Sequence, residues 1–156
     1  IYLRDFLVKR KSGEIIAKAT SGWLAIDVNT KRPKIVDGLY TGIFKHLKDK
    51  HALNELPEKL SQQKEGEEFL INTTYFDIDL NKHVTSSRYI DWMMDTFPVD
   101  FHKNNYPWKI SINYIKETMP GEKILLLRTQ PNEKDFLFEG FHSSSSNSAY
   151  RGKLEF

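Results

Sequence analysis

The stretch YFDIDLNKHVTSSRYIDW, residues 75–92, joins two different hydrophobic patterns and decides the fold. An apolar, β-prone run from Phe69 to Phe76 enters it, so a strand is predicted over residues 69–79. Apolar residues then recur at helical spacing from about Ser86, which predicts a helix with Ser86 or Ser87 as N-cap and a stop at Pro98. Polar side chains therefore gather at a strand-to-helix corner, where free helix N–H groups stabilise negative charge.

A solvated turn is the simplest interpretation of this corner, because Asp and Asn are common in turns and at N-caps. Asp77, Asp79 and Asn81 also have the alternate spacing of a calcium loop, but Lys82 and Arg88 occupy the positions of its Gly and Glu. One His with nearby carboxylates lacks a clear set of metal ligands. The local residues leave two options, a turn or an acid–base site, and Asp77 is interpreted as a turn or supporting residue.

The remainder of the chain after this stretch is rich in strand signals. Strands are predicted at residues 108–116, 123–129, 136–141 and 149–156, with turns at 119–122, 131–135 and 143–148. Such short connections predict antiparallel pairing. The preceding helix is apolar around most of its circumference and is expected to be buried. The order strand, helix, four strands predicts an α+β fold with a sheet around one helix.

The N-terminal region has a different pattern. Strands are predicted at residues 1–8 and 14–28, on either side of a Lys11-Ser12-Gly13 turn. A polar connection follows, in which apolar residues between Leu39 and Leu47 have the spacing of a short amphipathic helix.

Composition limits the chemistry that this chain of 156 residues can perform. Hydrophobic content of 39% and charged content of 28% are typical of a globular protein with one core. Cysteine is absent, which excludes disulfides, cysteine metal ligands and a cysteine nucleophile. His46 and His51 lack acidic residues at ligand spacing and are interpreted as surface residues. No metal, no cofactor and no membrane insertion are expected, and a cytoplasmic location is expected.

Two separated motifs resemble the acyl-acyl carrier protein (acyl-ACP) thioesterases, a family of hotdog-fold enzymes. DLNKHV at residues 79–84 is similar to the family's Asp-x-Asn-x-His-Val at the entry to the central helix. Glu117 lies thirty-six positions after Asn81, where the family places a Glu. AKATSGW at residues 17–23, followed by TKRP at 30–33, is similar to the family's Ala-x-Ser-x-Trp strand and Thr-Arg-Arg-Pro. Two matches in the right order are more specific than either alone.

The resemblance implies a hotdog fold, in which an antiparallel sheet wraps a central helix. It implies that residues 1–32 are the back half of a first hotdog repeat and that residues 33–68 are a linker with a short helix. Residues 69–156 would then be a complete second repeat that carries the catalytic motif. The front half of the first repeat has no counterpart here, so the chain is expected to be a fragment.

The resemblance further implies that Asp79, Asn81, His83 and Glu117 are catalytic residues of a thioester hydrolase in fatty acid biosynthesis and lipid metabolism. Asn81 can donate and accept hydrogen bonds, His83 can shuttle protons, and Glu117 can activate water. Direct attack by Asp79 or Glu117 to form an anhydride is the alternative. Backbone N–H groups over residues 83–86 are expected to form the oxyanion site. The family places Cys at the position of Thr118, so a thiol mechanism is not available here.

The expected substrate and partner is an acyl carrier protein that carries a fatty acyl chain, hydrolysed to a free fatty acid. The net charge is +2, and the basic clusters at residues 9–11 and 31–34 suit an acidic carrier, although solvated surface is their simplest interpretation. Nucleic acid is not expected as a partner, because no stacking motif accompanies the charge. A homodimer is one option for the assembly. An acyl-CoA thioesterase of the hotdog fold and a non-catalytic acyl-binding module are the alternatives.

The position of Glu117 poses a geometric question. Apolar residues from Trp108 to Tyr114 alternate on one face of their predicted strand, so regular pleating puts Glu117 on the other face with Asn113. Either that face lines the site, or a bulge near Ile115 redirects the carboxylate.

Overall fold

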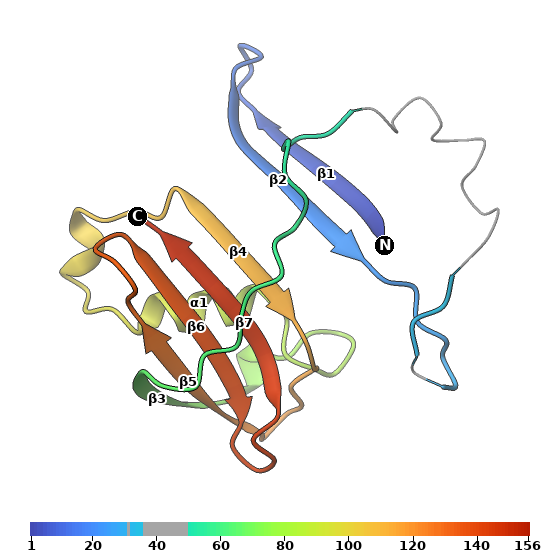
Figure 1. Ribbon diagram of the computed structural model, residues 1–156, viewed down its shortest axis with the longest axis vertical. Coiled ribbons are helices and arrows are strands. Elements are labelled where there is room, and N and C mark those ends of the chain that lie inside the picture. The colour runs from blue at the N-terminus through green and yellow to red at the C-terminus, as the bar shows by residue number, and fades with distance from the viewer. Residues whose placement is uncertain (31, 36–49) are drawn as a thin grey trace. The chain divides into compact units, whose positions relative to one another are not determined.

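The computed structural model describes residues 1–30, 32–35 and 50–156. The chain divides into two compact units, Ile1–Glu58 and Lys59–Phe156 (Figure 1). The helix predicted between Leu39 and Leu47 lies outside the described residues, as do Lys31 and His46.

The first unit contains the predicted hairpin. β1 (Tyr2–Lys9) and β2 (Ile15–Trp23) pair antiparallel in a sheet of their own. Gly13 has a φ of +91°, a left-handed conformation that suits the turn between them. β2 ends at Trp23 and not at residue 28 as predicted, because the Asp27 carboxylate accepts hydrogen bonds from the N–H groups of Asn29 and Thr30 and turns the chain.

A five-stranded antiparallel sheet with one α-helix makes up the second unit. Its strands are β3 (Glu67–Asn72), β4 (Lys109–Tyr114), β5 (Lys123–Thr129), β6 (Asp135–His142) and β7 (Ser148–Glu155). They lie in the order β3-β5-β6-β7-β4, and every neighbouring pair is antiparallel. The four strands predicted after residue 108 are confirmed, and the largest difference is an end at Tyr114 where residue 116 was expected.

The strand predicted over residues 69–79 is wrong in its second half. β3 ends at Asn72, and a 3₁₀ turn, η2 (Tyr75–Asp77), follows. The N–H and hydroxyl of Thr74 both donate to the Asp77 carboxylate, and this local bonding competes with strand pairing. The side chains of Tyr75 and Phe76 are consequently exposed, although hydrophobicity alone had placed them in a strand.

The predicted helix is present as α1 (Ser86–Asp95). Its N-cap residue is Thr85, one position before the two serines that were expected. The helix ends before Pro98 because Thr96 caps it, with its hydroxyl donating to the Met93 carbonyl at 2.7 Å. Another 3₁₀ turn, η3 (Phe101–Lys103), leads towards β4.

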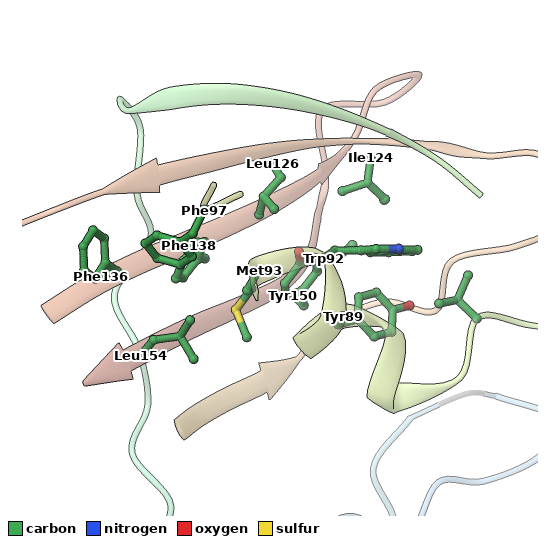
Figure 2. Packing of buried hydrophobic residues seen from close by; sticks show 12 residues of the cluster. Tyr89, Trp92, Met93, Phe97, Ile124, Leu126, Phe136, Phe138, Tyr150 and Leu154 are labelled. Carbon is green, nitrogen blue, oxygen red and sulfur yellow. The ribbon is translucent and has the colours of Figure 1, made fainter. Parts of the chain in front are cut away.

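The core lies between α1 and the sheet. Figure 2 shows Tyr89, Trp92 and Met93 of α1 among the apolar side chains of the strands. Gly152 allows this close packing, because a Cβ there would lie 2.0 Å from the Met93 sulfur. The expected burial of the helix is confirmed for Tyr89, Trp92 and Met93. The unit is therefore the predicted α+β arrangement of one antiparallel sheet around one helix.

The segment after Lys59 crosses the other face of the sheet (Figure 1). Leu60 donates its N–H to Asn113 at 2.8 Å, and its carbonyl accepts from Arg151 at 3.2 Å. The N–H of Gln63 donates at 3.1 Å to Glu139, a fully buried carboxylate that also pairs with Arg151 at 2.8 Å. These polar contacts hold the crossing segment in place.

Candidate active site

The DLNKHV motif forms a tight loop between η2 and α1. Ile78 and Val84 pair across the base of this loop as an isolated antiparallel bridge. Inside it, the Asp79 N–H donates to the His83 carbonyl and the Lys82 N–H donates to the Asp79 carbonyl, both at 3.0 Å. Lys82 adopts a φ of +67°, a left-handed conformation uncommon for a residue other than Gly. The loop thus fixes the backbone from which three of the expected catalytic residues project.

The structure brings all four expected catalytic side chains together. Oδ1 and Oδ2 of Asp79 accept hydrogen bonds from the backbone N–H and side-chain amide of Asn81, at 2.8 and 3.3 Å. Nδ1 of His83 lies 3.8 Å from Oδ1 of Asp79, and its Nε2 lies 3.8 Å from Oε1 of Glu117. His83 therefore stands between two carboxylates. Both distances exceed a hydrogen bond.

The two carboxylates have different surroundings. The Asp79 side chain is 30% exposed and engaged by Asn81, whereas that of Glu117 is 73% exposed. Asp79 is suited to hold its neighbours, and Glu117 is suited to reach a bound molecule.

A bulge settles how Glu117 reaches the site. The N–H groups of Ile115 and Lys116 both donate to the Ala149 carbonyl, at 2.9 and 3.0 Å, so two residues oppose one on β7. The bulge considered near Ile115 is thereby confirmed. One position beyond Glu117, the Thr118 carbonyl accepts a hydrogen bond from the N–H of Val84 at 2.9 Å. This bond links the loop that carries Asp79, Asn81 and His83 to the segment that carries Glu117.

The expected oxyanion site has to be corrected. The N–H of Val84 is engaged by Thr118, and that of Thr85 donates to the Asp77 carbonyl at 2.9 Å. Neither is free for an oxyanion, so the prediction over residues 83–86 is wrong for these two groups. Ser86 and Ser87 begin α1, where first-turn N–H groups have no acceptor within the helix.

An ion pair that the sequence did not reveal closes the ends of the loop. Asp77 is buried in η2, and its Oδ1 accepts from Nε of Arg88 at 2.6 Å. Burial favours a raised pKa for Asp77, but the hydrogen bonds from Thr74 and the charge of Arg88 outweigh it and hold that pKa below its usual value. Asp77 is thus the turn and supporting residue that was expected. Arg88 was missed because its partner lies eleven positions away, outside any local motif.

Tyr89 also supports the site from the core. Its hydroxyl accepts the N–H of Thr118 at 3.3 Å, and its ring packs against Tyr114 and Tyr150. Burial raises the pKa of Tyr89, which keeps the phenol neutral. Its helical spacing had indicated only a core residue.

An open groove of about 650 Å³ lies beside Asp79. Most of its lining is apolar, and Tyr75, Phe76 and Leu80 expose their side chains there. The complete lining is Thr73, Thr74, Tyr75, Phe76, Ile78, Asp79, Leu80, Pro120 and Gly121. Within the described ranges, no group of three or more His, Cys, Asp or Glu side chains is arranged to hold a metal ion.

Comparison with solved structures defines the class of protein as a hotdog fold. The crystal structure of an acyl-ACP thioesterase from Bacteroides thetaiotaomicron superposes with a TM-score of 0.85 at 27% identity, covering 99% of this chain and 62% of that chain. A 12:0-ACP thioesterase from Umbellularia californica superposes with a TM-score of 0.80 at 20% identity, covering 98% and 61%. The second similarity is one of fold alone.

The family follows from sequence comparison. The acyl-ACP thioesterase C-terminal domain matches residues 60–153, which is more than half of the chain. The chain therefore belongs to the acyl-ACP thioesterase family.

Curated relatives agree with this assignment. The chloroplastic acyl-ACP hydrolase FATB3 of Cuphea viscosissima is 29% identical over 120 residues, or 73% of this chain and 29% of the relative. The chloroplastic oleoyl-acyl carrier protein thioesterase 2 of Arabidopsis thaliana is 23% identical over 159 residues, or 93% and 43%. The chain spans less than half the length of these two relatives.

Proposed function

We propose that the protein hydrolyses the thioester of a fatty acyl-acyl carrier protein and releases the free fatty acid. One observation carries this proposal: in a member of the acyl-ACP thioesterase family, His83 lies 3.8 Å from the carboxylates of both Asp79 and Glu117. An imidazole between two carboxylates can accept and return a proton near neutral pH.

In the proposed reaction, Glu117 takes a proton from water and the resulting hydroxide forms a C–O bond with the thioester carbonyl carbon. First-turn N–H groups of α1 and the free amide hydrogen of Asn81 stabilise the oxyanion. The C–S bond then breaks, and His83 gives its proton to the departing thiolate. Asp79 holds Asn81 and His83 in place. The proton on Glu117 then passes to His83, which restores both groups, and the released carboxylic acid loses its own proton to solvent.

Direct attack by a carboxylate is the alternative route. Asp79 is poorly suited to attack, because both of its oxygens already accept hydrogen bonds from Asn81. Glu117 is exposed enough to attack, so the choice lies between water and Glu117. Added hydroxylamine would trap an anhydride on Glu117, whereas it leaves the enzyme unmodified if water attacks.

The groove beside Asp79 supplies apolar surface for part of the acyl chain. Its exposed Tyr75, Phe76 and Leu80 side chains can be covered by methylene groups, each of which contributes about 0.8 kcal/mol when buried.

Charge near the site favours an acidic carrier protein as partner. Lys82 and Lys116 are exposed and directly adjoin His83 and Glu117 in the sequence. The basic clusters near the N-terminus contribute less, since Arg10 pairs with Glu14 at 2.9 Å and Lys34 lies 3.6 Å from Asp27.

The test is thiol release from purified protein with acyl-ACP and, separately, acyl-CoA carrying the same chain. We expect a higher kcat/KM with acyl-ACP. Higher values with acyl-CoA would support the acyl-CoA alternative, and acyl binding without turnover would support a non-catalytic module.

The proposed cytoplasmic location is tested by cell fractionation. Across the part of the chain that is described, no helix is long and apolar enough to cross a membrane.

A further inference from the structure

A buried histidine outside the catalytic cluster has no role in the reaction described above. His142 ends β6, and its side chain is only 2% exposed. Its Nδ1 lies 3.2 Å from Oε2 of Glu122, but the approach is too poorly aligned for a regular hydrogen bond. Its Nε2 has no hydrogen-bond partner within residues 1–30, 32–35 and 50–156. An apolar side chain here would avoid the cost of burying two polar nitrogens.

Glu122, the neighbour of His142, fixes the turn that follows the site. Its Oε2 accepts the N–H of Met119 at 2.8 Å, while its own N–H donates to the Met119 carbonyl at 3.2 Å. The turn is therefore closed from both ends by one residue. Oε2 is the same oxygen that His142 approaches, so the buried ring limits where this carboxylate can lie.

The same turn is anchored to the end of β3. The N–H of Gly121 donates to the hydroxyl of Thr73 at 2.8 Å, and the N–H of Thr73 donates to the Glu122 carbonyl at 3.3 Å. Met119 is two positions after Glu117, so a displaced turn would move the carboxylate that faces His83. Glu117 itself is 73% exposed and has little packing of its own to hold it.

We propose that His142 and Glu122 are positioning residues that set the place of Glu117 relative to His83. The inference rests on the proposed function. It adds to the proposed mechanism two residues that do not contact the substrate. His142 confines the Glu122 carboxylate, Glu122 closes the turn at Met119, and the turn holds Glu117 at its distance of 3.8 Å from His83. Small displacements matter here, because misplacement by 1 Å can cost about a hundredfold in rate.

The kinetic test replaces His142 by Leu in the whole protein. We expect kcat for acyl-ACP to fall about tenfold with KM changed less than twofold, because positioning and not binding is lost. His142→Asn keeps an N–H close to the place of Nδ1 and should restore most of kcat. Phe136→Leu, a core change at the opposite end of β6, is the matched control and should lower stability without changing kcat.

A double-variant cycle separates positioning from general weakening of the fold. In a Glu117→Gln background, adding His142→Leu should lower kcat less than twofold, because the carboxylate that His142 positions is already absent. A second tenfold loss would show that His142 acts elsewhere and would overturn the proposal.

Amide hydrogen exchange tests the positioning without any substrate. In His142→Leu we expect the Met119 amide to exchange about tenfold faster, while Leu126 in the middle of β5 keeps its rate. Unchanged exchange at Met119 would contradict the proposal whatever the activity. If the wild-type protein releases no thiol yet Met119 loosens, the proposed function fails and the positioning role stands.

Discussion

Glu117 is the residue whose replacement bears most directly on the proposed chemistry. Glu117→Gln keeps the size of the side chain but cannot take a proton from water, so we expect kcat to fall about a hundredfold or more. The measurement is thiol release by matched folded proteins. Glu133→Gln, an exposed change in the turn before β6, is the control and should have wild-type activity. Activity of Glu117→Gln within twofold of wild type would remove Glu117 from the mechanism.

Asp77 gives a prediction of pH-dependent stability. Its pKa is lower in the folded protein than in the unfolded chain, so its contribution is fully present above about pH 4 and is lost as pH falls through the folded pKa. Asp77→Asn should cost about 2 kcal/mol at pH 7, the scale of hydrogen bonds to a charged group. Denaturant unfolding at pH 7 and pH 3 measures this cost. The loss of unfolding free energy caused by Asp77→Asn should be smaller at pH 3 than at pH 7. An equal loss at the two pH values would contradict the role of the ion pair with Arg88.

Among the elements, those with a regular pattern were predictable and those set by local hydrogen bonds were not. β5 was placed correctly because its continuous apolar run, residues 124–127, lies between two clear turns. η2 was missed because Thr74 and Asp77 bond to each other, and an apolar run carries no sign of that.

The candidate site likewise contains residues that the sequence predicted and residues that it did not. Asp79, Asn81 and His83 lie in one short motif, so the sequence places them together without knowledge of the fold. Contacts of Arg88 and His142 with their carboxylates depend on how distant segments meet, so no local pattern could indicate them.

Close packing between β6 and β7 gives a prediction at the scale of an element. A Cβ on Gly140 would lie 2.2 Å from the rigid, fully buried ring of Tyr150, so Gly140→Ala should destabilise the protein by about 2 kcal/mol. Thermal or denaturant unfolding measures the change. The double variant Gly140→Ala with Tyr150→Ala should lose less free energy of unfolding than the sum of the losses in the two single variants, because the clash is then absent. Strict additivity would show that the two residues do not compete for space.

For the whole molecule, charge should govern the choice between carrier protein and coenzyme A. In the proposed function, exposed Lys82 and Lys116 beside the site would attract an acidic carrier protein, and salt screens charges more than about 8 Å apart at physiological ionic strength. We expect kcat/KM for acyl-ACP to fall as salt rises, and to fall less for acyl-CoA. Lys82→Gln with Lys116→Gln should flatten the salt dependence for acyl-ACP. Identical salt profiles for wild type and this double variant would place the docking charge elsewhere.

The family assignment rests on the second unit, since the matched domain covers residues 60–153. That unit contains Asp79, His83 and Glu117, the helix α1 and the groove beside Asp79.

The most direct test of the account is thiol release from fatty acyl-ACP by the wild-type protein and by His83→Ala, measured side by side. His83 lies 3.8 Å from each carboxylate, and the proposed protonation of the departing thiolate depends on it. We predict steady turnover by the wild type and a loss of about a hundredfold or more in His83→Ala, with unchanged unfolding behaviour. Equal rates for the two folded proteins would contradict the assignment of this cluster as the active site.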